Sequence, residues 1–310
     1  MHIFGVLLTI LGSCLLAAFA IGQRKAFTRG EENEDRPHES VLLAGTYLVA
    51  AGVLYLAFLC SGQPIQMRAN FWIYGMTTGL LNVAISYCGF KAVASKEDVS
   101  IVIPIRDTTP AIIVFTAWFI TGERPSAIGY LGVLFLVMGT YTLNVHTLME
   151  KLHGGKWTWI AFLEPWKALS RSTGVRFAFL GSLIGCVAIT FDGLASRSAH
   201  PLFALAYVLS FPAIMHLTRV IIGGRTRQLF DARRAMPKIA FGLGLLYASA
   251  GACYFVSFRF LLVAYQATVK RTETFLVLVF AYFLLGERKN FRSRMAAVAL
   301  MVIGTVLIAK

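Results

Sequence analysis

Long apolar stretches without charge, separated by short polar segments, dominate the chain. Six stretches contain no Lys, Arg, Asp or Glu, and each can supply the ~20 apolar residues that a helix needs to cross ~30 Å of hydrocarbon. They are residues 3–23, 41–67, 69–90, 125–149, 198–218 and 239–258. Because these runs are continuous and do not alternate, they predict membrane-spanning helices and not the strands of a transmembrane β-barrel.

Four further apolar segments complete the predicted set of spans. Residues 177–191 and 295–309 are shorter and can cross if flanking residues snorkel, while residues 99–120 and 261–285 are interrupted by charge. The sequence therefore predicts an all-α polytopic membrane protein with ten transmembrane helices. The predicted centres are Ile10, Ala51, Leu80, Pro110, Phe135, Leu183, Leu209, Leu246, Phe275 and Met301.

Composition narrows the class of protein further. Apolar residues make up 57% of the 310 residues and charged residues 14%, whereas soluble domains average about 45–50% and about 25%. These values exclude a soluble enzyme, a disordered chain and a disulfide-rich secreted module. The net charge of +14 would favour nucleic acid in a soluble protein. Here the bases lie between apolar runs, so the predicted partner is the lipid bilayer and not nucleic acid.

The bases also predict an orientation. The loops after the odd-numbered spans hold 21 Lys and Arg residues, and the opposite side, including both termini, holds five. The positive-inside rule therefore places the odd loops in the cytoplasm and both termini outside. The sequence has no Asn-x-Ser/Thr site, which favours a bacterial inner membrane over a eukaryotic secretory organelle.

The chain repeats part of its own sequence. The segment from residue 105 to Gly122-Glu123-Arg124 aligns with the segment from residue 269 to Gly286-Glu287-Arg288. The repeat predicts a first five-helix unit at 1–147, a cytoplasmic interfacial linker at 148–176 and a second five-helix unit at 177–310. An odd number of spans per unit gives the two units inverted topology, as in many secondary transporters. Coincidental similarity between apolar segments is the alternative.

Charges near the predicted bilayer centre are the main candidates for chemistry. Arg106 and Asp107 interrupt the fourth span, and Lys270, Arg271 and Glu273 interrupt the ninth at the equivalent place. Interrupted spans at matching positions point to a transporter's central site, because a central charge is costly in lipid. Three bases and two acids leave a net +1, which suits a carboxylate, a phosphate or a zwitterion. The alternative is a structural lock in which Asp107 pairs with Arg271 and Arg106 with Glu273.

Other polar residues in the spans are weaker candidates. Asn82, Tyr254 and Gln266 can donate or accept hydrogen bonds with a polar solute, although such residues more often join helices. Asp192 lies at the end of its apolar run and is interpreted as an acid near the outer interface. Glu123 is expected to organise the loop that follows the fourth span, outside any substrate pathway.

Motifs for nucleotides and metals are missing from the sequence. No Gly-x-x-x-x-Gly-Lys-Ser/Thr loop occurs, so ATP-driven transport within this chain is not expected. No His-x-x-x-His or Cys-x-x-Cys pair occurs either, and no cofactor is predicted. A transporter of this kind needs an ion gradient or exchange, with protons or a counter-substrate as the driving partner and Asp107 or Glu273 as the coupling acid.

Several of these motifs together resemble one family. Pro104 and Pro110 in the fourth span, Gly122-Glu123-Arg124 after it and a Gly-rich fifth span ending near Gly139 are similar to the ten-helix, EamA-type members of the drug/metabolite transporter superfamily. The second half repeats the pattern without the two prolines. The resemblance implies export or exchange of small metabolites.

The leading hypothesis is a secondary transporter that carries a small polar, anionic or zwitterionic metabolite, such as an amino acid, by alternating access. One alternative is a flippase for an anionic lipid-linked intermediate. An alternative of another class is a polytopic membrane enzyme acting on lipid, although no nucleophile or metal set supports catalysis. The sequence leaves open whether the chain is a monomer or a homodimer.

Overall fold

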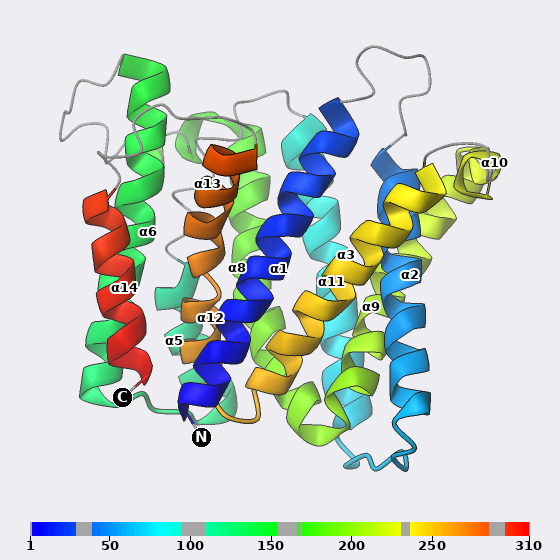
Figure 1. The fold of residues 1–310 in the computed structure, drawn as a ribbon, viewed down its shortest axis with the longest axis horizontal. Helices are drawn as coiled ribbons and strands as arrows, with labels where there is room; N and C mark the ends of the chain where they lie inside the picture. Colours follow the sequence, from blue (N-terminus) through cyan, green and yellow to red (C-terminus); the bar gives the residue numbers. More distant parts are fainter. Residues whose placement is uncertain are drawn as a thin grey trace.

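The computed structural model describes residues 2–28, 39–94, 109–153, 166–167, 169–230, 236–284 and 295–309. Every regular element within these ranges is a helix, as predicted, and the helices stand side by side in one bundle (Figure 1). Both chain termini lie at one end of the bundle, called here the terminal end, and the other end is called the linker end. The helices are α1 (His2–Thr28), α2 (Glu39–Cys60), α3 (Phe71–Ala94), α5 (Thr109–Thr121), α6 (Ala127–His153), α8 (Thr173–Ser198), α9 (Pro201–Ile222), α10 (Thr226–Phe230), α11 (Met236–Ser257), α12 (Val263–Val269), α13 (Thr272–Leu284) and α14 (Met295–Ala309).

Each of the ten predicted span centres falls within one of these helices. Five helices are long and apolar enough to cross a membrane, namely α1, α2, α8, α9 and α11. Shorter apolar helices occur in α5, α6 and α14. The full count of ten spans stays a prediction.

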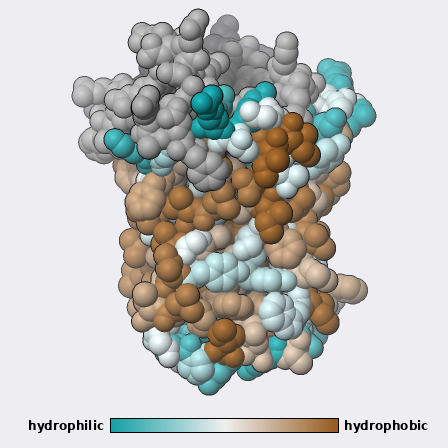
Figure 2. Space-filling view, turned by 90° about the vertical axis from the view of Figure 1, so that its right-hand side faces the viewer, coloured by the Kyte–Doolittle hydropathy of each residue, from teal (hydrophilic) through white to brown (hydrophobic). Residues whose placement is uncertain are grey.

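Large apolar side chains cover the outside of the bundle. Leu59, Phe119 and Ile222 are 67%, 88% and 82% exposed. Figure 2 shows hydrophobic residues over much of the middle of one face, with hydrophilic residues at both ends. Soluble monomers rarely expose such extended apolar surface, whereas a bilayer requires it, so the chain is an integral membrane protein.

Helices that are far apart in the sequence pack in four main pairs: α1 with α11, α2 with α9, α3 with α8, and α6 with α14. Glycines bring the α6–α14 pair close together. A Cβ atom on Gly304 would lie 2.7 Å from the carbonyl oxygen of Gly132, and a Cβ on Gly132 would lie 2.9 Å from that of Gly304. Small residues at such contacts let two backbones approach, which gives the packing that holds helices together in lipid.

The predicted span at 261–285 is broken in the structure. Helix α12 ends at Val269, Lys270 and Arg271 form a turn, and α13 begins at Thr272. At the turn the amides of Arg271 and Glu273 bond to carbonyl oxygens three residues earlier, at 3.0 and 3.1 Å. The helix therefore breaks at the same residues whose charges interrupt the apolar pattern. A cation at the C-terminus of α12 also complements the dipole of that helix.

Helices α6 and α8 both extend into the predicted linker at 148–176, since α6 ends at His153 and α8 begins at Thr173. Trp166, which the sequence assigns to this linker, donates from Nε1 to the hydroxyl of Tyr141 on α6 at 3.1 Å. Its ring also packs against Phe179 of α8. Trp166 thus contacts both α6 and α8.

Candidate functional site

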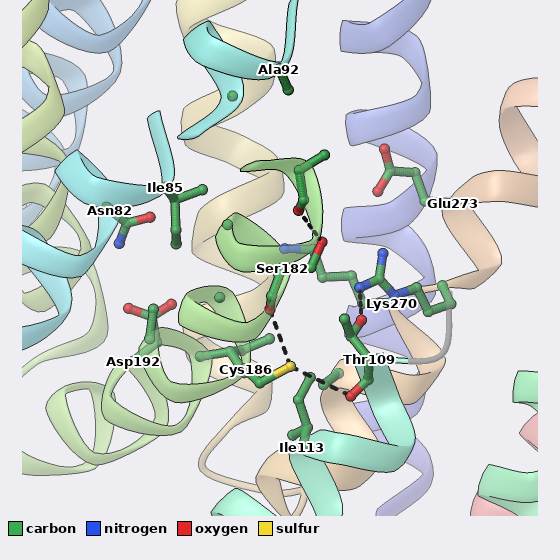
Figure 3. Close-up of a pocket in the computed structure, with 18 of the residues that line it drawn as sticks. Asn82, Ile85, Ala92, Thr109, Ile113, Ser182, Cys186, Asp192, Lys270 and Glu273 are labelled. Atoms are coloured by element: carbon green, nitrogen blue, oxygen red, sulfur yellow. Dashed lines mark hydrogen bonds between the residues drawn. The ribbon is translucent and has the colours of Figure 1, made fainter. Parts of the chain in front are cut away.

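A cavity of about 590 Å³ lies in the middle of the bundle. Residues from α1, α3, α5, α8, α11 and the α12–α13 break line it, and Figure 3 shows many of them. It reaches from Asp192 to Gly174 in the first turn of α8 and to Ala92 near the end of α3, so it extends toward the linker end. Its size lies within the ~300–1,000 Å³ of typical small-molecule sites.

The α12–α13 break supplies the cationic side of this cavity. Lys270, Arg271 and Glu273 all line it. The guanidinium of Arg271 donates to the hydroxyl of Thr109, the first residue of α5, so the break is joined to the fourth predicted span. The ammonium of Lys270 lies 4.6 Å from the centre of the Tyr254 ring, a cation–π distance.

Helix α8 supplies an acid on the other side. Asp192 Oδ1 accepts a hydrogen bond of 2.6 Å from the hydroxyl of Thr78 on α3. Asn82, one turn further along α3, donates to the carbonyl oxygen of Thr78 at 2.9 Å. Figure 3 shows Asp192 and Asn82 on one side of the cavity and Lys270 on the other, and Asp192 and Lys270 are near enough to interact electrostatically. Charges of both signs therefore face one space.

A second, smaller cavity of about 130 Å³ adjoins the first. The two cavities share Asn82, Asp192, Tyr247 and Lys270 among their lining residues. Apart from the residues shared by both cavities, the smaller one, called here the inner cavity, is lined by residues of α9 and α11, by Phe258 in the loop after α11 and by Gln266 of α12. Gln266 lines only the inner cavity, so the two spaces differ in the polar groups that they present.

The structure thus brings together six of the eight residues predicted for the site. Lys270, Arg271, Glu273 and Asn82 line the large cavity, and Tyr254 and Gln266 line the inner one. The hydroxyl of Tyr254 donates to Ser13 of α1 at 3.3 Å. The other two, Arg106 and Asp107, lie outside the described residues, as do both ion pairs of the structural-lock alternative.

Asp192 is not the loop-proximal acid that the end of its apolar run suggests. The apolar run ends at residue 191, but α8 continues to Ser198, so Asp192 lies more than one turn inside the helix and lines both cavities. The signal that could have found it is the small-residue pattern that follows it, because Gly193, Ala195 and Ser196 are all buried. Thr78, which is fully buried beside Asp192, could not be identified from the sequence because it carries no charge.

The terminal end of the bundle is closed by a polar cluster built on the Gly-Glu-Arg motif. Gly122 follows α5 with φ of +71°, a left-handed conformation that favours glycine. The next residue, Glu123, is 8% exposed at its side chain and forms an ion pair with Arg197 of α8. The Glu123 carboxylate also accepts the backbone amide of Val263 at 2.7 Å. The Glu123 carboxylate therefore joins the loop after α5 to α8 and to the first residue of α12.

Arg197 ties the same cluster to the loop between α11 and α12. Its guanidinium donates to the carbonyl oxygens of Phe258 and Leu261, each at 2.8 Å. We name Glu123, Arg197 and these backbone partners the terminal-end lock. It joins the α5–α6 loop, the end of α8 and the α11–α12 loop, on the side of the inner cavity away from the linker end.

Comparison with known proteins gives a family match for part of the chain and a shared fold for nearly all of it. Residues 3–145 match the EamA-like transporter family. No curated protein matches the chain. A solved structure described as "Crystal structure of protein" is 17% identical in sequence, with a TM-score of 0.70 over 98% of this chain and 95% of the other. At this identity the likeness shows a shared fold alone.

Proposed function

Because residues 3–145 form an EamA-like transporter domain, as the sequence motifs predicted, we propose that the chain is a secondary transporter of a small polar metabolite. The substrate is anionic or zwitterionic, such as an amino acid, and it binds in the large cavity. The observation that carries the proposal is the cavity itself, where Lys270 faces Asp192 across a space of metabolite size and Arg271 also contributes to the lining.

The chemistry of the two sides favours a zwitterion. A guanidinium or ammonium holds a carboxylate by charge-assisted hydrogen bonds, and a carboxylate such as Asp192 holds an ammonium in the same way. Thr78 uses one oxygen of Asp192, and a carboxylate has a second oxygen with further acceptor capacity. An α-amino acid carries both charges on neighbouring carbons and can therefore engage both sides at once.

Alternating access is supported by the way in which the helices pair. The sequence repeat aligns the fourth span with the ninth. The order of the helices in the two units then equates α1 with α8, α2 with α9, α3 with α11, α5 with α12–α13 and α6 with α14. A two-fold axis relating these units would convert the α3–α8 pair into the α11–α1 pair, and would leave α2–α9 and α6–α14 paired as they are. These are the four main pairs of the bundle. Inverted repeats of this kind allow two states that are related by the two-fold axis and open to opposite sides.

In this proposal the structure corresponds to a state closed toward the outside. The positive-inside count assigns the linker end to the cytoplasm and the terminal end to the outside of a bacterial inner membrane. The large cavity extends toward the linker end, and the terminal-end lock closes the other. Opening outward then requires that Glu123 and Arg197 separate.

A counterflow assay in reconstituted vesicles tests the function. Vesicles are loaded with an unlabelled amino acid mixture, a carboxylate mixture, phosphate esters or organic cations, and uptake of trace labelled compound is followed. We expect amino acids, and more weakly simple carboxylates, to exchange, and organic cations to fail because they meet Lys270 and Arg271. Exchange of organic cations alone, or of none of these classes, would contradict the proposal.

A further inference from the structure

The inner cavity has the character of a side-chain pocket. Apart from the residues that it shares with the large cavity, its lining is mostly aliphatic and aromatic, from Leu205, Val208, Leu209, Phe255 and Phe258. Its volume is about 130 Å³. An apolar cavity of about 150 Å³ engineered in another protein takes up benzene, so this space fits an uncharged group no larger than a benzene ring.

One polar side chain in this lining lacks a partner. Gln266 has no exposed surface, and within the described part of the chain neither its amide nitrogen nor its amide oxygen has a hydrogen-bond partner. Buried polar atoms are nearly always hydrogen-bonded. Gln266 is one of the residues that line the inner cavity, so a molecule in that cavity can supply the missing donor and acceptor once the Gln266 side chain turns toward it.

The distance between Gln266 and Lys270 also suits a small molecule that contacts both. Gln266 and Lys270 are four residues apart, and the amide of Lys270 bonds to the carbonyl of Gln266 at 2.9 Å, so both lie on one face of the helical turn. The rise of four helical residues is about 6 Å. A molecule whose carboxylate meets Lys270 can therefore reach Gln266 with a group three or four bonds further along.

We propose that the inner cavity is the side-chain pocket of the substrate site, and that Gln266 selects zwitterions whose uncharged side chain carries a hydroxyl or amide group. The charged ends of the substrate lie between Asp192 and Lys270, where the two cavities meet. The side chain then enters the inner cavity, and its hydroxyl or amide both donates to and accepts from the Gln266 amide. This inference rests on the proposed function.

The test uses pairs of amino acids that differ little in shape but differ in hydrogen bonding. Threonine is compared with valine and glutamine with methionine, each as a competitor of labelled amino acid exchange in reconstituted vesicles. We expect the polar member to compete at least about tenfold better than its apolar counterpart in one or more pairs. A site built to bond a hydroxyl or amide leaves its own polar group unpaired when the analogue lacks one.

The variant Gln266→Met removes the amide while nearly keeping the volume. We expect it to bring the preference ratio close to one and to leave competition by alanine, which is too short to reach position 266, unchanged. The control variant Gln63→Met makes the same substitution at an exposed residue outside both cavities and should keep the wild-type ratio.

Two results overturn the inference. One is a wild-type protein that exchanges amino acids without preference in either pair, a measurement that needs no variant to fold. The other is a Gln266→Met protein that keeps the preference. In both cases amino acid exchange persists and the proposed function stands, whereas absence of exchange for every amino acid refutes the proposed function and the inference with it.

Discussion

Breaking the terminal-end lock should open the terminal end of the bundle. The variant Arg197→Met removes the ion pair with Glu123 and the hydrogen bonds to the carbonyls of Phe258 and Leu261 while keeping an unbranched side chain. Hydrogen bonds to charged groups contribute about 1.5–3 kcal/mol each. Because the Arg197 side chain is 30% exposed, solvent screens part of this interaction energy. The three interactions together should therefore stabilise the closed state by about 2–4 kcal/mol. At 1.4 kcal/mol per factor of ten, the open state should gain about 30-fold to several hundred-fold in population.

The assay measures access to the cavity from the terminal end. A single cysteine replaces Ala267, which is 2% exposed and lines the large cavity, in a chain whose five natural cysteines are removed. A membrane-impermeant thiol reagent is added to sealed vesicles on the side where a C-terminal tag can be cleaved by protease. The labelling rate follows the population of the open state when opening is fast relative to reaction. The Arg197→Met protein should therefore be labelled about 30-fold to several hundred-fold faster than the parent protein.

The matched control is Arg124→Met, which removes an exposed arginine adjacent to Glu123 but outside the lock. It should label at the rate of the parent protein. Equal labelling rates for Arg197→Met and the parent protein, in protein that remains folded, would refute the role of the lock in closing this end.

Three further predictions concern the site, the packing and energy coupling. Asp192→Asn keeps an oxygen that can accept from Thr78 but loses the negative charge. The apparent affinity for zwitterions should therefore fall about 10- to 150-fold, which corresponds to the loss of about 1.5–3 kcal/mol for a hydrogen bond to a charged group. Competition assays should show this loss for zwitterions and an unchanged affinity for carboxylates without an amine. Gly304→Ala places a Cβ against the backbone of Gly132, which should cost about 1–3 kcal/mol and lower the melting temperature without changing substrate affinity. Glu273→Gln should still exchange substrate at equal concentrations but lose the response of net transport to a pH gradient, and an unchanged response excludes this acid from coupling.

Much of the fold follows from the apolar pattern, for a physical reason. A bilayer forces the backbone to satisfy its hydrogen bonds within each span, so long apolar runs such as 41–67 predict helices with little competition. The same pattern marks residues 261–285 as interrupted, and the structure breaks that helix at Lys270 and Arg271. Charge is costly in lipid, so these residues could be singled out from the sequence.

What the sequence could not give is the arrangement of residues in space. Asp192 follows the end of its apolar run, and only packing against α3 and α11 shows that α8 continues past it. Gln266 could be named as a candidate, but that its amide lacks a partner depends on which side chains surround it. The role of Arg197 also depends on its surroundings. The sequence predicts only a basic residue in a loop, whereas the structure shows that carbonyl oxygens of the α11–α12 loop accept its hydrogen bonds.

The central claim is that Lys270, at the break between α12 and α13, binds the carboxylate of a transported metabolite. Counterflow of a labelled amino acid by Lys270→Gln, compared with wild type and with Lys238→Gln, tests it most directly, because Lys238 is exposed and lies outside both cavities. Lys270→Gln should lower exchange at least about tenfold, from about 1.5–3 kcal/mol for a hydrogen bond to a charged group, and Lys238→Gln should match wild type. Equal exchange by Lys270→Gln and wild type would contradict the account.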